Sequence, residues 1–151
     1  MARIKILLVL VVAILISGCG GGGSSSTSDA DRFIGDWYGS MIETGNDYGG
    51  ELDSPTLHMH IEYAGKDTIA GITMEYISVS IFLDDVLFAA GVITAIPGGV
   101  WNLDISGADY TLTMLGQFSG NSASGSWDLV TNNPDPPYEQ WTIWGTWSAT
   151  R

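Results

Sequence analysis

The sequence predicts an all-β protein whose folded part is a single antiparallel meander β-barrel of about eight strands, with a β-sandwich as the alternative. Three observations lead to this prediction. Apolar and polar residues alternate over short stretches, turn residues separate these stretches, and apolar residues do not recur at helical spacing. We favour the barrel because sequential hairpins that close on themselves leave no strand edge exposed.

The chain begins with the parts of a signal peptide. Arg3 and Lys5 are basic, residues 6–16 are apolar, and two small residues follow before Cys19. A retained membrane helix is the alternative, but the apolar stretch is shorter than the ~20 residues that a membrane span needs. Residues 1–18 are therefore predicted to be a signal peptide that is removed.

Residues 16–19 read Ile-Ser-Gly-Cys, which resembles the lipobox of bacterial lipoproteins. In that family the signal peptide is cleaved before the cysteine, and the cysteine sulfur carries diacylglycerol. The resemblance implies that Cys19 is lipidated and that the lipid attaches the protein to a membrane. Gly20, rather than Asp, follows the cysteine, and by the same resemblance this favours the outer membrane of the cell envelope.

Residues 19–30 are predicted to be the lipidated cysteine and a flexible linker, because residues 20–28 are all Gly, Ser or Thr. Residues 31–151 then form one β-barrel domain of ordinary size. Cys19 is the single cysteine of the chain. The domain therefore has no disulfide and no thiol nucleophile.

The clearest strand pattern covers residues 56–63, where every second residue from Leu57 to Tyr63 is apolar and faces the predicted core. A similar alternation resumes at Ile72 and changes phase near Tyr76, which predicts a β-bulge or a tight turn. Residues 132–137 hold three prolines and are predicted to be a loop before the last strand, residues 139–149. Other turns are predicted at residues 84–85, 97–99, 106–109 and 119–121.

Four of the six tryptophans follow a glycine by two positions, in residues 35–37, 99–101, 125–127 and 145–147. Residues two apart on a strand share a face, so each glycine leaves space beside its own tryptophan. Packing of these rings in the core is one interpretation. The alternative is a set of stacking platforms for a sugar or a flat ligand, with Trp101 and Trp127 as candidate binding residues. Trp144 joins them because it falls on the polar face of the last strand.

The first of these triplets, in Gly35-Asp36-Trp37-Tyr38, resembles the opening strand of the small lipocalin and avidin barrels. In those barrels a basic residue of the last strand packs over that tryptophan, and Arg151 is the candidate here. The resemblance implies a cation–π contact between Arg151 and Trp37, and a small apolar or flat ligand inside the barrel. Gly39 stands where the avidin strand has an Asn that contacts biotin, which argues against biotin as the ligand.

Two metal sites are candidates. His58, His60 and Glu62 share one face of a strand, and they suit zinc if a neighbouring strand supplies a fourth ligand. The simpler interpretation is a solvent-facing row, since the residues between them are apolar. A calcium site is the other candidate, built from the acidic loop that carries Asn46, Asp47, Glu51 and Asp53.

Charge and chemistry exclude several function classes. The chain has a formal charge of −12, and removal of Arg3 and Lys5 leaves three cations against seventeen carboxylates, or −14. Such an acidic protein repels phosphate backbones, so nucleic acid is excluded as a partner. The sequence shows no catalytic constellation, which predicts a protein that is not an enzyme.

We therefore expect a lipid-anchored envelope protein that binds a small apolar or flat ligand in its barrel. The first alternative is a structural or interaction protein with a filled barrel, which docks another protein or a glycan. A weaker alternative is a metal-binding module built on His58 and His60. The barrel interior separates the first two, because about eight strands enclose either packed side chains or one small ligand.

Overall fold

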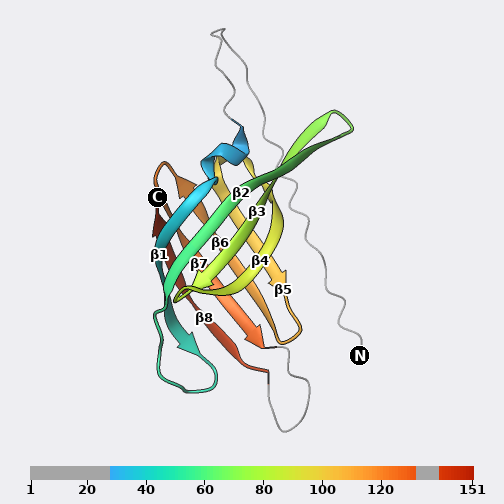
Figure 1. The fold of residues 1–151 in the computed structure, drawn as a ribbon. Helices are drawn as coiled ribbons and strands as arrows, with labels where there is room; N and C mark the ends of the chain where they lie inside the picture. The colour runs from blue at the N-terminus through green and yellow to red at the C-terminus, as the bar shows by residue number, and fades with distance from the viewer. Residues whose placement is uncertain (1–27, 132–139) are drawn as a thin grey trace, which may run out of the picture.

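The computed structural model describes residues 28–131 and 140–151, and it confirms an all-β fold. The eight strands are antiparallel, and they form one sheet that curls into a nearly closed barrel (Figure 1). Two short 3₁₀ helices accompany them. The elements in chain order are η1 (Asp29–Arg32), β1 (Gly35–Asn46), β2 (Thr56–Ile69), β3 (Ile72–Leu83), β4 (Val86–Ala95), η2 (Pro97–Gly99), β5 (Val100–Ser106), β6 (Tyr110–Ser119), β7 (Ser122–Thr131) and β8 (Thr142–Thr150).

The strand order in the sheet is β4-β3-β2-β1-β8-β7-β6-β5, so the first and last strands pair. The sheet edges, β4 and β5, lie next to each other without a ladder of hydrogen bonds. Between them η2 turns the chain without a hairpin, and its Pro97 has no N–H to donate. This seam is a difference from the predicted barrel, which leaves no strand edge.

Two side chains connect β4 to β6, the neighbour of β5, across the seam. The Tyr110 hydroxyl, on β6, donates a hydrogen bond to the backbone carbonyl of Phe88 on β4. The two rings also stack, with their centroids 4.9 Å apart and their planes 15° apart. The barrel is therefore held together here by side chains rather than by backbone pairing.

The predicted change of phase near Tyr76 corresponds to a bulge in the neighbouring strand. The register of β2 against β3 shifts between Tyr63 and Gly65, which lie opposite Ile77 and Tyr76. Beyond this bulge the two strands continue past the barrel as a protruding hairpin (Figure 1). The alternation predicts Tyr63 on the inner face, but Tyr63 lies where the hairpin leaves the barrel and is 48% exposed.

Several predicted turns join the strands as expected. Asp84 and Asp85 connect β3 to β4 with positive φ values of 48° and 63°, and Gly120 lies between β6 and β7. The predicted proline loop lies outside the described residues, as do residues 1–27, which include the predicted signal peptide and Cys19. None of the helices in the described part has the length and hydropathy of a membrane span.

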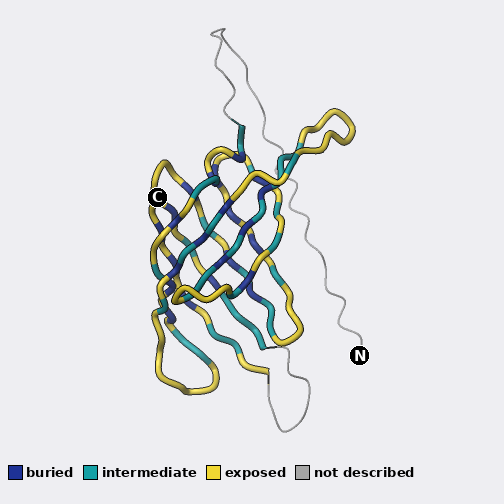
Figure 2. The backbone as a smooth tube through the Cα atoms, in the orientation of Figure 1, coloured by how far each residue is buried: buried dark blue, intermediate teal, exposed yellow. Residues whose placement is uncertain are grey.

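Aromatic side chains fill the interior at one end of the barrel. η1 lies across this end, and Phe33, the next residue, is buried against Trp101 and Phe118. Trp37 meets Phe118 edge-on, with the ring centroids 4.7 Å apart. Figure 2 shows that buried positions alternate with exposed or half-buried ones along the strands. We call this end, which η1 covers, the closed end, and the opposite end the open end.

The Gly-x-Trp triplets on β7 and β8 pack against each other reciprocally. The strand register places Gly125 opposite Trp147, and Trp127 opposite Gly145. A Cβ on Gly145 would lie 2.8 Å from Nε1 of Trp127, so the indole occupies the space that this glycine leaves. The space serves the tryptophan of the neighbouring strand, because residues directly opposite each other are closer than residues two apart on one strand.

Candidate functional site

A pocket of about 170 Å³ lies inside the barrel at its open end. Its lining residues come from the later parts of β1, β3 and β7, the early parts of β4, β6 and β8, and the β1–β2 connection. Most of the wall is apolar. The apolar lining residues are Met41, Pro55, Leu83, Phe88, Leu112, Trp127, Leu129 and Ile143, and the acidic ones are Glu43 and Asp53.

Glu43 is the one charged residue that is buried among the described residues, with 6% of its surface exposed. β1 points it inward, because Trp37, Met41 and Glu43 occupy alternate positions that face the interior. In the same row across β8 and β7 stand Gly145 and Trp127. Since Gly145 has no side chain, no side chain separates the Glu43 carboxylate from the Trp127 indole along this row.

Hydrogen bonds hold the Glu43 carboxylate in place. Oε1 accepts from Nδ2 of Asn46 at 2.6 Å, and Oε2 accepts from the backbone N–H of Asp53 at 3.2 Å. Oδ1 of Asn46 accepts from the backbone N–H groups of Gly49 and Gly50, which fixes the amide so that its NH₂ faces Glu43. A carboxylate has about four acceptor positions, so these two bonds leave acceptor capacity for a ligand.

The pocket has the size and chemistry to take a small apolar group. A cavity of ~150 Å³ holds one benzene molecule, so this pocket has room for one ring or a short chain. Trp127 forms part of the wall and is 8% exposed. Its indole N–H donates to the Thr146 carbonyl at 3.1 Å, so the polar atom is satisfied and the ring is available for apolar contact.

Of the three tryptophans predicted to bind a ligand, Trp127 lines this pocket and the other two lie elsewhere. Trp101 is 1% exposed and belongs to the aromatic cluster at the closed end. Trp144 points outward from β8, is 42% exposed and covers Gly45, whose added Cβ would lie 2.5 Å from the ring. The three side chains therefore do not form one site.

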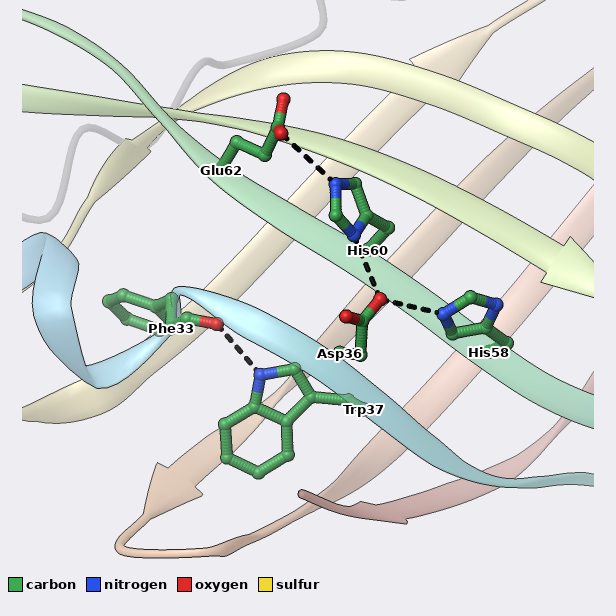
Figure 3. Close-up of polar contacts among 6 residues, drawn as sticks. All are labelled: Phe33, Asp36, Trp37, His58, His60 and Glu62. Carbon is green, nitrogen blue, oxygen red and sulfur yellow. Dashed lines mark hydrogen bonds and ion pairs between the residues drawn. The ribbon is translucent and has the colours of Figure 1, made fainter.

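Gly35, Trp37 and Arg151 meet at the closed end. The guanidinium carbon of Arg151 lies 5.0 Å from the centroid of the Trp37 ring, and Nη1 donates to the Ile34 carbonyl at 2.9 Å. Nε1 of Trp37 donates to the Phe33 carbonyl at 2.7 Å (Figure 3). Gly35 has a φ of 130°, which favours glycine, and lies beside the Arg151 side chain. These contacts tie the last residue of the chain to the start of β1.

His58, His60 and Glu62 lie on the outer face of β2, beside Asp36 of β1, and we call these four residues the histidine row (Figure 3). Oδ1 of Asp36 lies 3.0 Å from Nε2 of His58 and 2.8 Å from Nδ1 of His60. Nε2 of His60 lies 3.2 Å from Oε1 of Glu62. Hydrogen bonds from His58 and His60 lower the pKa of Asp36 from 3.8, whereas those to Asp36 and Glu62 raise the pKa of His60 from 6.5.

The polar groups of the histidine row are in contact with one another. Both ring nitrogens of His60 contact carboxylates, and the His58 ring is stacked against Tyr38 and Phe82, at centroid distances of 4.5 Å and 5.2 Å. Within residues 28–131 and 140–151, no group of three or more His, Cys, Asp or Glu side chains is arranged to hold a metal ion. In the predicted calcium loop, Oδ1 of Asp47 accepts from the Thr142 N–H at 2.8 Å, which ties the loop to β8.

A second hollow of about 430 Å³ lies between η1 and strands β3 and β4. Its acidic residue on β3, Glu75, accepts hydrogen bonds from the Ser28 hydroxyl at 2.5 Å and from the Ala30 N–H at 3.0 Å. The bond from Ser28 contributes most, and together these bonds lower the pKa of Glu75 from 4.5. The carboxylate thus anchors η1 to the barrel, where the described chain begins.

Comparison of the chain with protein-family models, with curated proteins and with solved structures gives no match in any of the three. Function is therefore inferred from the pocket itself.

The sequence predictions do not include Glu43, the buried polar residue of the pocket, although the sequence holds a signal for it. Counting in steps of two from Trp37 places Met41 and Glu43 on the inner face. The sequence carries no signal that Phe88 and Leu112 share a cavity with Glu43, because only the closure of the barrel brings their strands together.

Proposed function

We propose that this protein is a ligand-binding lipoprotein of the cell envelope, which holds a small apolar or flat molecule in its barrel. The observation that carries the proposal is the pocket at the open end, with its apolar wall and the buried carboxylate of Glu43. Small-molecule sites in proteins are usually concave and apolar, with a few polar groups that orient the ligand. Aromatic side chains fill the closed end, so the ligand occupies one end of the barrel.

The course of the chain supports the same proposal. The described structure begins at Ser28 and η1, at the closed end (Figure 1). A lipid on Cys19, joined through the flexible Gly/Ser linker, attaches the protein to the membrane by its closed end. The pocket lies at the opposite end from this attachment, where a ligand from the aqueous phase has access to it.

Native mass spectrometry of the purified protein, compared with a denatured spectrum, tests whether a ligand is present. We expect additional mass that disappears on denaturation. A Leu129→Trp variant is expected to lose this mass, because the larger side chain fills the pocket. Leu115→Trp is the matched control, since Leu115 lies on β6, is 47% exposed and does not line the pocket.

A bare protein mass alone does not decide against the proposal, since a weak ligand is lost on purification. Toluene therefore serves as a second probe, followed by the fluorescence of Trp127 and the other tryptophans. Binding of toluene by the wild type and by Leu115→Trp, but not by Leu129→Trp, is the expected result. A bare mass together with no response to toluene would overturn the ligand-binding proposal.

The alternative function is docking of a protein or glycan on the outer face. The observation that favours it is the stack of Tyr38, His58 and Phe82 across β1, β2 and β3, in which Tyr38 is 58% exposed. Exposed aromatic rings suit contacts that are apolar on one side and wet on the other. Binding to cell-wall glycan that Tyr38→Ser abolishes and Leu129→Trp leaves unchanged is the result expected of this alternative.

A further inference from the structure

Glu43 is a buried carboxylate with no Lys, Arg or His beside it in the described part of the chain. The ion pairs of that part all lie in the histidine row on the outer face. Burial of a carboxylate without a cation is costly, and two N–H donors compensate only part of this cost. Folding has already removed most water from Glu43. A cationic ligand that reaches the carboxylate therefore gains an ion pair without a second dehydration of Glu43.

Charge is distributed unevenly between the two ends of the barrel. The β1–β2, β3–β4 and β5–β6 connections lie at the open end, and they carry Asp47, Glu51, Asp53, Asp84, Asp85 and Asp109. The Lys and Arg residues of the described part lie elsewhere, with Arg32 and Arg151 at the closed end and Lys66 on the protruding hairpin. A field of this sign draws cations toward the pocket and repels anions.

The wall of the pocket selects among cations. Calcium takes six or more oxygen ligands, and zinc takes four nitrogen, sulfur or oxygen ligands. The pocket offers two carboxylate side chains among apolar ones, which is too few polar groups for either ion. An organic cation needs fewer polar groups, because its apolar body packs against the wall. The indole of Trp127, which lines the pocket in the same row as Glu43, adds aromatic surface against which this body packs.

We propose that the pocket binds a small apolar amine, whose ammonium group pairs with Glu43 and whose ring or short chain packs against Trp127 and the apolar wall. This inference rests on the proposed ligand-binding function, and it names the chemical class of the ligand. The volume limits the apolar part to about one ring. Asp53, at the edge of the pocket, supplies a second negative charge for the approaching cation.

Calorimetric titration with probes of one size tests the proposal. Benzylamine, benzyl alcohol and toluene share the benzyl group, and at neutral pH benzylamine alone carries a charge. We expect benzylamine to bind about tenfold to a hundredfold more tightly than benzyl alcohol, the usual effect of one charged hydrogen bond. Benzoate, which has the opposite charge, is expected not to bind.

The variant Glu43→Gln removes the charge and keeps the shape of the side chain. It is expected to bring the affinities for benzylamine and benzyl alcohol together, mainly by weakening benzylamine. Asp109→Asn is the matched control, because it removes one charge at the same end without touching the pocket wall. This control is expected to keep the preference for benzylamine.

The outcomes separate this inference from the proposed function. If benzyl alcohol and toluene bind wild type as tightly as benzylamine, the pocket takes apolar ligands and the amine inference is wrong. If no probe binds, the amine inference is wrong, and a bare native mass in addition overturns the ligand-binding proposal as well. If Glu43→Gln fails to fold, judged by circular dichroism, the comparison of benzylamine with benzoate on wild type decides the matter. Equal binding of these two probes overturns the inference.

Discussion

At the scale of single residues, β1 shows how one strand serves two environments. Asp36 and Trp37 are neighbours in the sequence, yet Asp36 joins the histidine row outside the barrel and Trp37 joins the aromatic cluster inside it (Figure 3). Successive side chains of a strand point to opposite faces, which explains this division. Glu43 falls on the inner face by the same rule, so its burial follows from its position.

The histidine row predicts a pH dependence of stability. The pKa of His60 is raised above 6.5, so its pairing with Asp36 and Glu62 stabilises the fold below about pH 6.5 and is lost as the pH rises through the raised value. The lowered pKa of Asp36 gives stability above about pH 3.8 that is lost as the pH falls through the lowered value. The stabilisation by this row is therefore greatest between these two limits.

We expect the free energy of unfolding contributed by this row to decrease between about pH 6 and about pH 9, and Asp36→Asn to reduce that decrease. Urea denaturation at the two pH values measures it. Asp104→Asn, which changes an exposed residue of β5, is the control for loss of a carboxylate outside the row. High salt is expected to shrink the effect, because the row is exposed to solvent. An unchanged pH profile in Asp36→Asn contradicts the assignment of this pH dependence to the histidine row.

At the scale of elements, β7 and β8 depend on glycines where indoles need space. A Cβ on Gly145 would lie 1.9 Å from the Ile42 carbonyl oxygen and 2.8 Å from Nε1 of Trp127. The added Cβ would meet the Ile42 backbone on one side and the buried Trp127 ring on the other. It cannot be accommodated unless the strands shift. The repeated Gly-x-Trp pattern thus lets the tryptophan of one strand pack over the glycine of its paired strand.

Gly145→Ala is expected to lower the free energy of unfolding by about 2 kcal/mol or more, through forced displacement of Trp127 and β1. Chemical denaturation measures this loss. Gly107→Ala is the control, since the closest atom to its added Cβ lies at 3.6 Å, an ordinary contact. Equal stability of the two variants would contradict the packing argument.

The seam between β4 and β5 makes a second prediction at this scale. Tyr110→Phe removes the hydroxyl that donates to the Phe88 carbonyl and keeps the stacked ring. We expect a loss of about 1 kcal/mol in the free energy of unfolding and faster hydrogen exchange of the β4 amides. In Tyr38→Phe, where the ring is exposed on the outer face, neither quantity is expected to change. Unchanged exchange in Tyr110→Phe means that the seam does not depend on this bond.

At the scale of the whole molecule, the two barrel ends differ in how their interiors are filled and in the charged residues they carry. The closed end has η1, the filled aromatic cluster and the Arg151–Trp37 contact. The open end has the pocket, Glu43 and the acidic connections. The described chain enters at the closed end. A membrane tether and a ligand site thus occupy opposite ends in the proposed function.

The proposed lipid tether is tested at Cys19. In the lipoprotein family that the N-terminus resembles, lipidation and cleavage both require this cysteine. We expect Cys19→Ser to abolish labelling by a clickable fatty acid and to leave residues 1–18 attached, as read from the intact mass. Ser24→Ala, in the linker, is expected to leave both unchanged. Labelling that persists in Cys19→Ser would show that the anchor is elsewhere or absent.

Local patterns determined much of this protein from the sequence alone. Alternation with a period of two predicted the all-β class, and turn residues predicted the Asp84–Asp85 and Gly120 turns. The resemblance in β1 pointed to a contact between Arg151 and Trp37, and the guanidinium does lie over that ring. Each of these features depends on residues that are close in the chain or on one pair of neighbouring strands, so none of them requires knowledge of how the whole barrel closes.

Only the tertiary structure decided which strands meet around the pocket and which remain unpaired. Trp101 and Trp127 share the Gly-x-Trp pattern in the sequence, yet Trp101 is buried at the closed end and Trp127 lines the pocket. The unpaired seam and the pocket wall arise from the register of all eight strands together. A period of two tells which side chains point inward, but the closure of the barrel determines what each of them meets.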